Sequence, residues 1–245
     1  MQSIKTLLSS FCVFIFLNGC GSNPEKPVKD NKTIEKMADA GQESSAAAQP
    51  KPKVNIPTSI LPAGPATPNP YLQNPPKLSD QVQFAFNEAV ASMQQKKWDQ
   101  AEVVLKQLAE KNPKLSGIYL NLGIVYRNKG NAFKAAEEFN RAITANPKNL
   151  DAYNQLAVLK RESGDFAAAE NLYQKALGVW PFYAEGHKNI AILYDLYLSK
   201  PEQALPHYLA YQQLLTTPDK QVDSWVAEIQ RRLNAGKATS TTEAN

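Results

Sequence analysis

The sequence predicts an all-α fold: an α-solenoid of about four helix hairpins with a C-terminal capping helix, preceded by a disordered tether. Three observations lead to this prediction. Apolar residues recur at steps of three and four, small residues recur at a fixed step of 34 residues, and a proline closes each 34-residue unit. An irregular helical bundle would not hold such a fixed period along its chain.

The second unit shows the pattern most clearly. Tyr119, Leu122 and Tyr126 share one helix face because residues three or four apart lie on the same side of a helix. Gly130 interrupts this stripe, and a second apolar stripe follows it. Pro147 then ends the unit, since proline cannot continue a helix. The unit therefore predicts two short antiparallel helices.

Four columns of residues repeat at the 34-residue step, and the members of each column share a size or a shape. They are Pro113, Pro147 and Pro181; Ala101, Ala135 and Ala169; Leu105, Phe139 and Tyr173; and Ala89, Gly123, Ala157 and Ala191. Small side chains let helix axes approach, and bulky ones fill the space beside them. One hairpin cannot bury its apolar face alone, so we expect stability to come from the stacking of neighbours.

In period and in the pattern Trp/Tyr…Leu-Gly…Tyr…Ala…Phe…Pro, these residues resemble the tetratricopeptide repeat (TPR). The resemblance implies repeats at about 82–115, 116–149, 150–183 and 184–217. It also implies an array that binds other proteins.

The first and last repeats depart from the pattern. Trp98 is expected in the turn of the first repeat, where it would pack as a lid. In the fourth repeat Ala204 falls one residue late, so an insertion is expected in the turn at 197–200. Pro201 suits a first helical turn, whereas Pro206 is expected to kink or delay the second helix.

The residues after the repeats predict a capping helix at 218–234. Thr217 would cap this helix, with Pro218 in its first turn. An apolar stripe at helical spacing would cover the last repeat; it consists of Val222, Trp225, Val226, Ile229 and Leu233. Residues 235–245 predict a disordered tail.

Residues 1–19 predict a lipoprotein signal peptide. An apolar run from Leu7 to Leu17 has the length of a signal-peptide core and is short for a membrane span. The tetrapeptide Leu17-Asn18-Gly19-Cys20 resembles the lipobox of bacterial lipoproteins. That resemblance implies that Cys20 carries acyl chains such as palmitate, and that Gly21 favours the outer membrane. An ordinary secretory signal or an uncleaved anchor are the alternatives.

Residues 20–77 predict a lipid-anchored, disordered, Pro-rich linker. Eleven of the 17 prolines lie between Pro24 and Pro76, and large apolar residues are few. As a flexible coil the linker would span roughly 40 Å. The alternative is that it serves as a Pro-rich ligand for a partner protein or the cell wall.

Composition argues against nucleic-acid binding and against catalysis. Residues 78–234 hold 18 Lys+Arg and 17 Asp+Glu, a net charge of +1 that offers no basic face to nucleic acid. Cys12 would leave with the signal peptide and Cys20 would be acylated. His187 falls in a packing column, and His207 has no partner at metal-ligand spacing. The sequence therefore predicts no enzyme, no catalytic residue, no cofactor and no metal site.

The candidate site is a partner-binding groove lined by the first helices. One column there holds Asn87, Asn121, Gln155 and Asn189, and Arg127 and Arg161 lie further along the same helices. Amides donate and accept hydrogen bonds, which suits an extended peptide segment, and the arginines suit a carboxylate. In the alternative interpretation the amides serve only hydrogen bonds between repeats.

Together these observations predict a non-catalytic TPR scaffold or adaptor, lipid-anchored to the periplasmic face of the outer membrane of a Gram-negative bacterium. It would bind proteins in the periplasm and support the assembly or regulation of an envelope complex. Two more specific roles are open. By resemblance, one is a pilotin-like factor for type IV pilus secretin assembly; the other, for which the sequence has no direct motif, is an accessory subunit of a TonB/ExbB/ExbD-type energised transport system.

Overall fold

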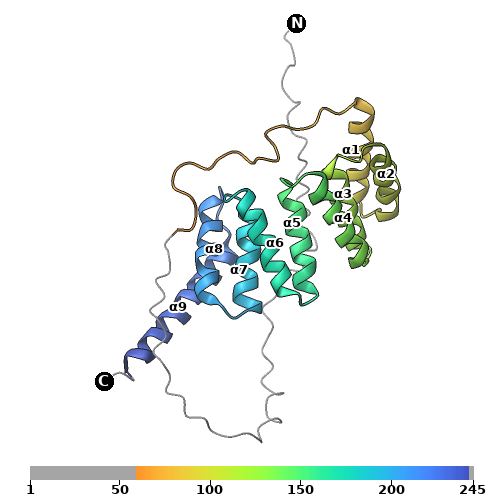
Figure 1. Ribbon diagram of the computed structural model, residues 1–245. Coiled ribbons are helices and arrows are strands. Elements are labelled where there is room, and N and C mark those ends of the chain that lie inside the picture. Colours follow the sequence, from red (N-terminus) through yellow and green to blue (C-terminus); the bar gives the residue numbers. More distant parts are fainter. Residues whose placement is uncertain (1–58, 243–245) are drawn as a thin grey trace, which may run out of the picture.

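The computed structural model describes residues 59–242, with side chains described over 59–235. The predicted signal peptide, Cys20 and residues 20–58 of the predicted linker lie outside the described residues. Within the described range the chain is all-α, as predicted: nine α-helices and one π-helical turn pack as successive hairpins (Figure 1).

Eight of these helices pair into four hairpins, and a ninth follows them. The pairs are α1 (Asp80–Gln94) with α2 (Trp98–Lys111), α3 (Ser116–Asn128) with α4 (Ala132–Ala145), α5 (Leu150–Glu162) with α6 (Phe166–Val179), and α7 (Ala184–Ile192), continued by η1 (Leu193–Tyr197), with α8 (Pro201–Leu214); α9 (Lys220–Thr242) closes the series. Helices pack mainly on their neighbours in the chain, which makes a linear array from α1 to α9 (Figure 1).

The repeated columns form the centre of the packing. Their small and bulky members are fully buried; at 0 % exposure these include Ala101, Ala135, Ala169, Ala204, Leu105, Phe139, Tyr173 and Tyr208. A Cβ atom on Gly123 would lie 2.4 Å from Cε1 of the buried Phe139 ring. Only glycine therefore fits at this point of the α3–α4 contact.

The four hairpin turns share one residue in the left-handed backbone region. It is Lys96, Gly130, Gly164 and Ser199 in successive turns, with φ of 58°, 76°, 81° and 52°. Two of the four positions have glycine, which adopts this conformation at low cost, and two do not. The step between them is 34, 34 and then 35 residues.

The extra residue of the fourth repeat lies in η1 rather than in the predicted turn at 197–200. The amide of Leu198 bonds the carbonyl of Leu193 at 3.0 Å, an i to i+5 bond typical of a π-helical turn. A π-helical turn admits one more residue without breaking the helix. Ala204 and Tyr208 therefore still reach the buried columns, one residue late in sequence but in place in space.

Pro206 does not delay the second helix of the fourth repeat, so that part of the prediction is wrong. The helix α8 begins at Pro201, as predicted, and continues through Pro206 to Leu214. Proline removes one backbone hydrogen bond of a helix. Burial of Pro206 and its neighbours supports α8 despite that loss, because packing contributes more to helix stability than propensity does.

Two further details differ from the predictions. Trp98 is the first residue of α2 rather than a turn residue, and it packs half-buried against the core of the first repeats. The cap of α9 is Asp219 rather than Thr217: its carboxylate accepts hydrogen bonds from the amides of Gln221 at 3.1 Å and Val222 at 3.3 Å. The helix extends past residue 234 to Thr242, into the predicted tail.

Residues 59–77 of the predicted disordered linker lie along the array and contact it. The Trp180 indole donates a hydrogen bond to the Thr67 carbonyl at 3.0 Å, and the Tyr71 and Ser116 hydroxyls are 3.2 Å apart. In Figure 1 this segment begins at the α8 end of the molecule and leads to α1. None of the helices between residues 59 and 242 has the length and apolar character needed to cross a membrane.

Candidate protein-binding surface

The amide column lies where the sequence predicts it, one residue on each first helix. Asn87 is on α1, Asn121 on α3, Gln155 on α5 and Asn189 on α7. Asn87 is exposed and the other three are half-buried. Stacking of equivalent hairpins thus sets four amides in a row that solvent can reach.

Each of these amides already makes a hydrogen bond within the domain. Asn87 accepts one from Gln83 at 2.9 Å, and Asn121 donates one to the Gly117 carbonyl at 2.7 Å, both inside their own helix. Asn189 donates to Asn154 at 2.9 Å and so connects α7 to α5. These bonds use part of each amide's capacity, because a primary amide has two donors and an acceptor with two lone pairs.

Arg127 is a connector between repeats. Its Nη1 donates to Oε1 of Gln155 at 3.1 Å, and its Nη2 donates to Oε1 of Glu162 at 2.5 Å. The ion pair with Glu162 already compensates the charge that was predicted to attract an acidic partner. Arg127 therefore joins α3 to α5 and holds the Gln155 amide in place.

Arg161, the equivalent residue on α5, has no such partners. The residue is 7 % exposed, and its Nε and Nη1 have no hydrogen-bond partner among the described residues. Its guanidinium lies 5.4 Å from the ring centroid of Tyr197, which is 38 % exposed at the end of η1. The two unbonded donors are themselves buried, and the Tyr197 ring beside them is the accessible part of this region.

Behind Arg161 lies a set of buried polar groups that the sequence did not reveal. Oδ1 of Asp195 on η1 accepts from Nη2 of Arg232 on α9 at 2.5 Å, while Oδ2 of Asp195 and the hydroxyls of Tyr173 and Tyr208 are buried without a partner among the described residues. Burial raises the pKa of Tyr173 to about 12. The late position of Ala204 was the one sequence signal for this region, since it marks the insertion that shapes η1.

His187, which falls in a packing column of the sequence, contacts His207. Their Nδ1 atoms are 2.9 Å apart, and Nε2 of His187 lies 2.8 Å from the Pro181 carbonyl. A carbonyl only accepts, so Nε2 of His187 carries a proton and its Nδ1 accepts from His207. Burial lowers the pKa of His187, which the Pro181 carbonyl opposes, and burial with the nearby His187 lowers the pKa of His207 to about 3. The pair is a neutral packing contact between α7 and α8.

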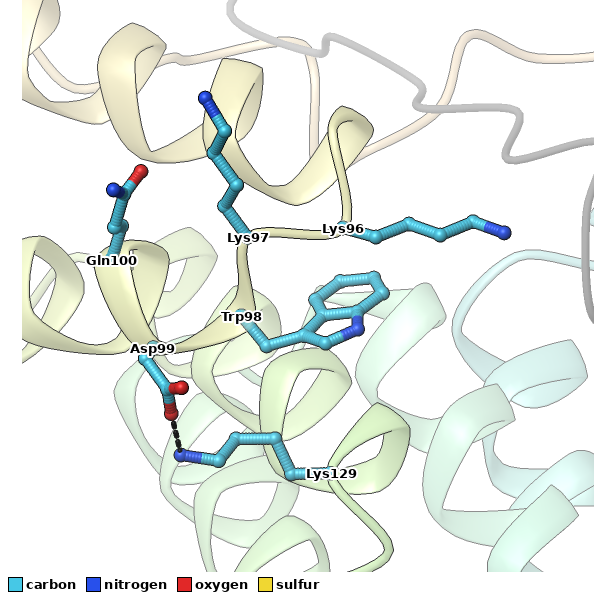
Figure 2. A pocket seen from close by; sticks show the side chains of 6 residues that line it. All are labelled: Lys96, Lys97, Trp98, Asp99, Gln100 and Lys129. Carbon is cyan, nitrogen blue, oxygen red and sulfur yellow. Dashed lines mark hydrogen bonds and ion pairs between the residues drawn. The ribbon is translucent and has the colours of Figure 1, made fainter.

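An open pocket lies at the turn ends of the first two hairpins. Figure 2 shows the Trp98 ring between the lysine side chains, and Lys129 reaching Asp99; the lining residues are Lys96, Lys97, Trp98, Asp99, Gln100 and Lys129. Lys129 bonds Asp99 at 2.5 Å and Glu102 at 2.6 Å. Hydrogen bonds from Lys106 and then Lys129 lower the pKa of Glu102 to about 2. These ion pairs fasten α2 to the turn after α3.

Between residues 59 and 235 no three His, Cys, Asp or Glu side chains cluster so that they could hold an ion. Asp195 and the histidine pair each engage protein groups instead.

Comparison with known proteins agrees with this geometry. Two tetratricopeptide repeat families match the chain, one over residues 114–181 and the other over residues 154–216. Such repeats are typically non-catalytic scaffolds that bind proteins or peptides. No curated protein is significantly similar to the chain.

Solved structures share the architecture. The structure reported as a functional characterization of pilF from Pseudomonas aeruginosa has 18 % sequence identity to the chain and a TM-score of 0.57, over 63 % of this chain and 69 % of that one. A double mutant of MamA has 15 % identity and a TM-score of 0.54, over 68 % and 93 %. At these identities the likeness is one of fold. The buried columns and the two matching repeat families together identify residues 114–216 as tetratricopeptide repeats.

Proposed function

We propose that the protein is a membrane-anchored TPR scaffold that binds a protein or an extended peptide segment along its first helices and supports an envelope complex in the periplasm. The observation that carries the binding role is Arg161. Its buried guanidinium keeps Nε and Nη1 unbonded among the described residues, beside the exposed ring of Tyr197. A buried donor without a partner is costly, so a partner's acceptor group would gain more here than at a solvated arginine.

The row of amides supports the same role. Each amide keeps donor or acceptor capacity beyond its internal bond, and successive amides are 34 residues apart. An extended segment crossing the first helices would meet one amide per repeat. Arg127 fixes the position of one amide in this row, because it donates a hydrogen bond to Oε1 of Gln155.

Photocrosslinking in cells tests the proposed surface. A photoreactive amino acid placed at Asn121 or Asn189 is expected to capture a partner that mass spectrometry identifies. The matched controls are Glu137 and Lys175, exposed residues of the second helices α4 and α6. If the control positions capture the same protein equally well, the first helices are not the binding surface.

Anchoring is proposed from the lipobox resemblance at Cys20, which lies outside the described residues. Mass spectrometry of the mature protein from membranes is expected to find acyl chains on Cys20, and Cys20→Ala is expected to release the protein from the membrane fraction. Unmodified Cys20 in a protein that still pellets with membranes would refute lipidation and leave the binding surface untouched. The proposed outer-membrane location is tested by separating the membranes on a sucrose gradient, where the protein is expected in the outer-membrane fraction.

The two more specific roles are outcomes of the same capture experiment. A secretin among the captured proteins would support a pilotin-like role in type IV pilus assembly. An ExbB-like or ExbD-like protein would support a role in energised transport. The likeness to pilF is one of fold at 18 % identity and does not decide between these two roles.

A further inference from the structure

The segment at 59–77 is rich in proline and contains no helix or strand. It contains Pro62, Pro65, Pro68, Pro70, Pro75 and Pro76. Proline fixes one backbone dihedral and disfavours helix in the residue before it, so such a segment stays extended with unused carbonyl groups. A surface that offers a hydrogen-bond donor beside an aromatic ring can therefore bind it without unfolding anything.

Trp180 offers such a donor. Its indole N–H lies 3.0 Å from the Thr67 carbonyl and 3.3 Å from the Thr67 hydroxyl. Thr67 directly precedes Pro68, which holds the Thr67 backbone extended. Trp180 is the C-cap of α6, and the Phe182 ring meets it edge-on with centroids 6.4 Å apart. Aromatic side chains that donate to carbonyls are the usual means of recognising extended Pro-rich segments.

A second contact lies two repeats away on the same edge of the array. The Tyr71 hydroxyl is 3.2 Å from Oγ of Ser116, the first residue of α3, and Ser116 also bonds Asn149, the cap of α5. The Tyr71 amide donates to the side chain of Asn69 at 2.9 Å, a local turn that directs Tyr71 toward the helices. The segment is thus attached at two points, both at connections between repeats.

The residue at the first contact departs from its column. The C-caps of the second helices are Asn112 on α2, Asn146 on α4 and Trp180 on α6, each 34 residues from the next. Asn112 bonds a carbonyl of its own helix, and Asn146 bonds the amide of Lys148. Trp180 makes no such local bond among those described and instead bonds a residue 113 positions away.

We propose that Trp180 and Phe182 form a docking site for an extended Pro-rich segment, and that its occupant is the chain's own segment 65–71. The docked segment fastens the N-terminal linker to the junction of the third and fourth repeats. Because the segment is tethered, its effective concentration at the site is high, and a few contacts suffice to keep it docked. The site is separate from the amide row and does not depend on the proposed binding function.

Fluorine NMR of the full chain labelled with 5-fluorotryptophan tests the docking. Replacing residues 65–71 by a Gly/Ser sequence of equal length is expected to shift the Trp180 resonance and to leave those of Trp98 and Trp225 in place. The matched control replaces residues 50–56, also Pro-containing, and is expected to leave all three resonances unchanged. A Trp180 resonance that does not respond to the 65–71 replacement overturns the proposal.

The reciprocal experiment observes the segment. Trp180→Phe keeps an aromatic ring and removes the indole N–H, so the heteronuclear NOE of the Ala66 and Thr67 amides is expected to fall to the values of a mobile chain. Trp98→Phe is the control and is expected to leave them unchanged. If both variants still unfold in a cooperative thermal transition and the Ala66 and Thr67 amides have equal NOE values in the two, docking by the indole is refuted. If Trp180→Phe fails to fold, the replacement of residues 65–71 still tests the proposal, because that replacement leaves every repeat residue in place.

Discussion

Lys96 and Ser199 hold the same left-handed backbone conformation in the first and last hairpin turns, with φ of 58° and 52°, where the two middle turns have glycine. A residue with a side chain costs about 1 kcal/mol in this backbone region. Glycine avoids this cost but loses more conformational entropy on folding, which offsets part of the gain. Lys96→Gly and Ser199→Gly are therefore each expected to raise the free energy of unfolding by about 0.5 kcal/mol, measured by urea unfolding.

The middle turns provide the reverse change as a control. A Cβ on Gly130 or Gly164 would meet no atom within 4 Å, so any loss comes from backbone conformation alone. Gly130→Ala and Gly164→Ala should each lower the free energy of unfolding by about 1 kcal/mol. Opposite signs at equivalent turns are the expected result; equal signs would contradict the assigned backbone.

Gly123→Ala is expected to disrupt the contact between α3 and α4. Its Cβ would lie 2.4 Å from the Phe139 ring, which is fully buried and cannot move aside freely. Overpacking of this kind costs about 1–3 kcal/mol. Gly178→Ala in α6 is the matched control: no atom lies within 4 Å of the added Cβ, and alanine favours helix by up to about 1 kcal/mol. In thermal unfolding, the midpoint temperature is expected to fall in Gly123→Ala and to rise in Gly178→Ala.

The stability of the fourth repeat should fall with acidification because of the buried histidine pair. His207 has a pKa of about 3 in the folded chain and 6.5 when free, so the unfolded chain binds more protons between these values. The free energy of unfolding is then lost as pH falls from about 6.5 toward 3, by up to about 1.4 kcal/mol per pH unit from His207.

His207→Gln tests this dependence. Glutamine does not titrate and can still donate a hydrogen bond to His187. Urea unfolding at pH 7.5 and pH 5 should show a smaller pH effect in the variant than in the natural chain. An identical slope in both would show that other groups cause the acid sensitivity.

The cap of α9 should be Asp219 in solution. Its carboxylate accepts from two backbone amides and from Lys188 at 3.0 Å and Tyr211 at 3.2 Å, which ties α9 to α7 and α8. Burial alone would raise the pKa of Asp219, but these bonds hold it below its usual value. Asp219→Ala is expected to cost about 1–2 kcal/mol. Thr217→Ala, at the position where the sequence suggested a cap, should change stability little.

Replacing Arg161 should separate binding from stability. Arg161→Met removes a buried charge without hydrogen-bond partners for Nε and Nη1, so the free energy of unfolding is expected to stay level or rise by up to about 2 kcal/mol. Partner capture at Asn121 is expected to weaken. Arg127→Met is the control: it breaks the bonds to Gln155 and Glu162 and should lower stability by about 1–2 kcal/mol. If Arg161→Met captures the partner as well as the natural chain does, Arg161 is not part of the binding surface.

The array was predictable because its packing repeats in the sequence. The 34-residue step alone placed Ala101, Phe139 and Tyr173 in the core, since equivalent positions of stacked hairpins meet equivalent neighbours. The contact of His187 with His207 was not predictable in that way. It joins a first helix to a second helix across an insertion, and their relative rotation depends on η1.

The sequence predicted which helices carry the candidate residues, but only part of the bonding that those residues make. The column rule located the four amides, but it could not tell that Arg127 is paired and Arg161 is not, because Glu162 and Tyr197 lie outside the repeated columns. The Trp180 contact spans 113 residues to a segment with no period. Its one signal in the sequence was tryptophan in a column that otherwise holds asparagine.

The docking of Thr67 on Trp180 sets where a force on the N-terminal chain enters the molecule. While the hydrogen bond holds, a pull along the chain is taken up at the junction of α6 and α7. Once it yields, and Tyr71 after it, the load passes to Asp80 at the far end of the array, and the 13 residues from Thr67 to Asp80 add up to about 45 Å of reach. One indole N–H thus decides whether tension enters the array at the junction of α6 and α7 or at α1.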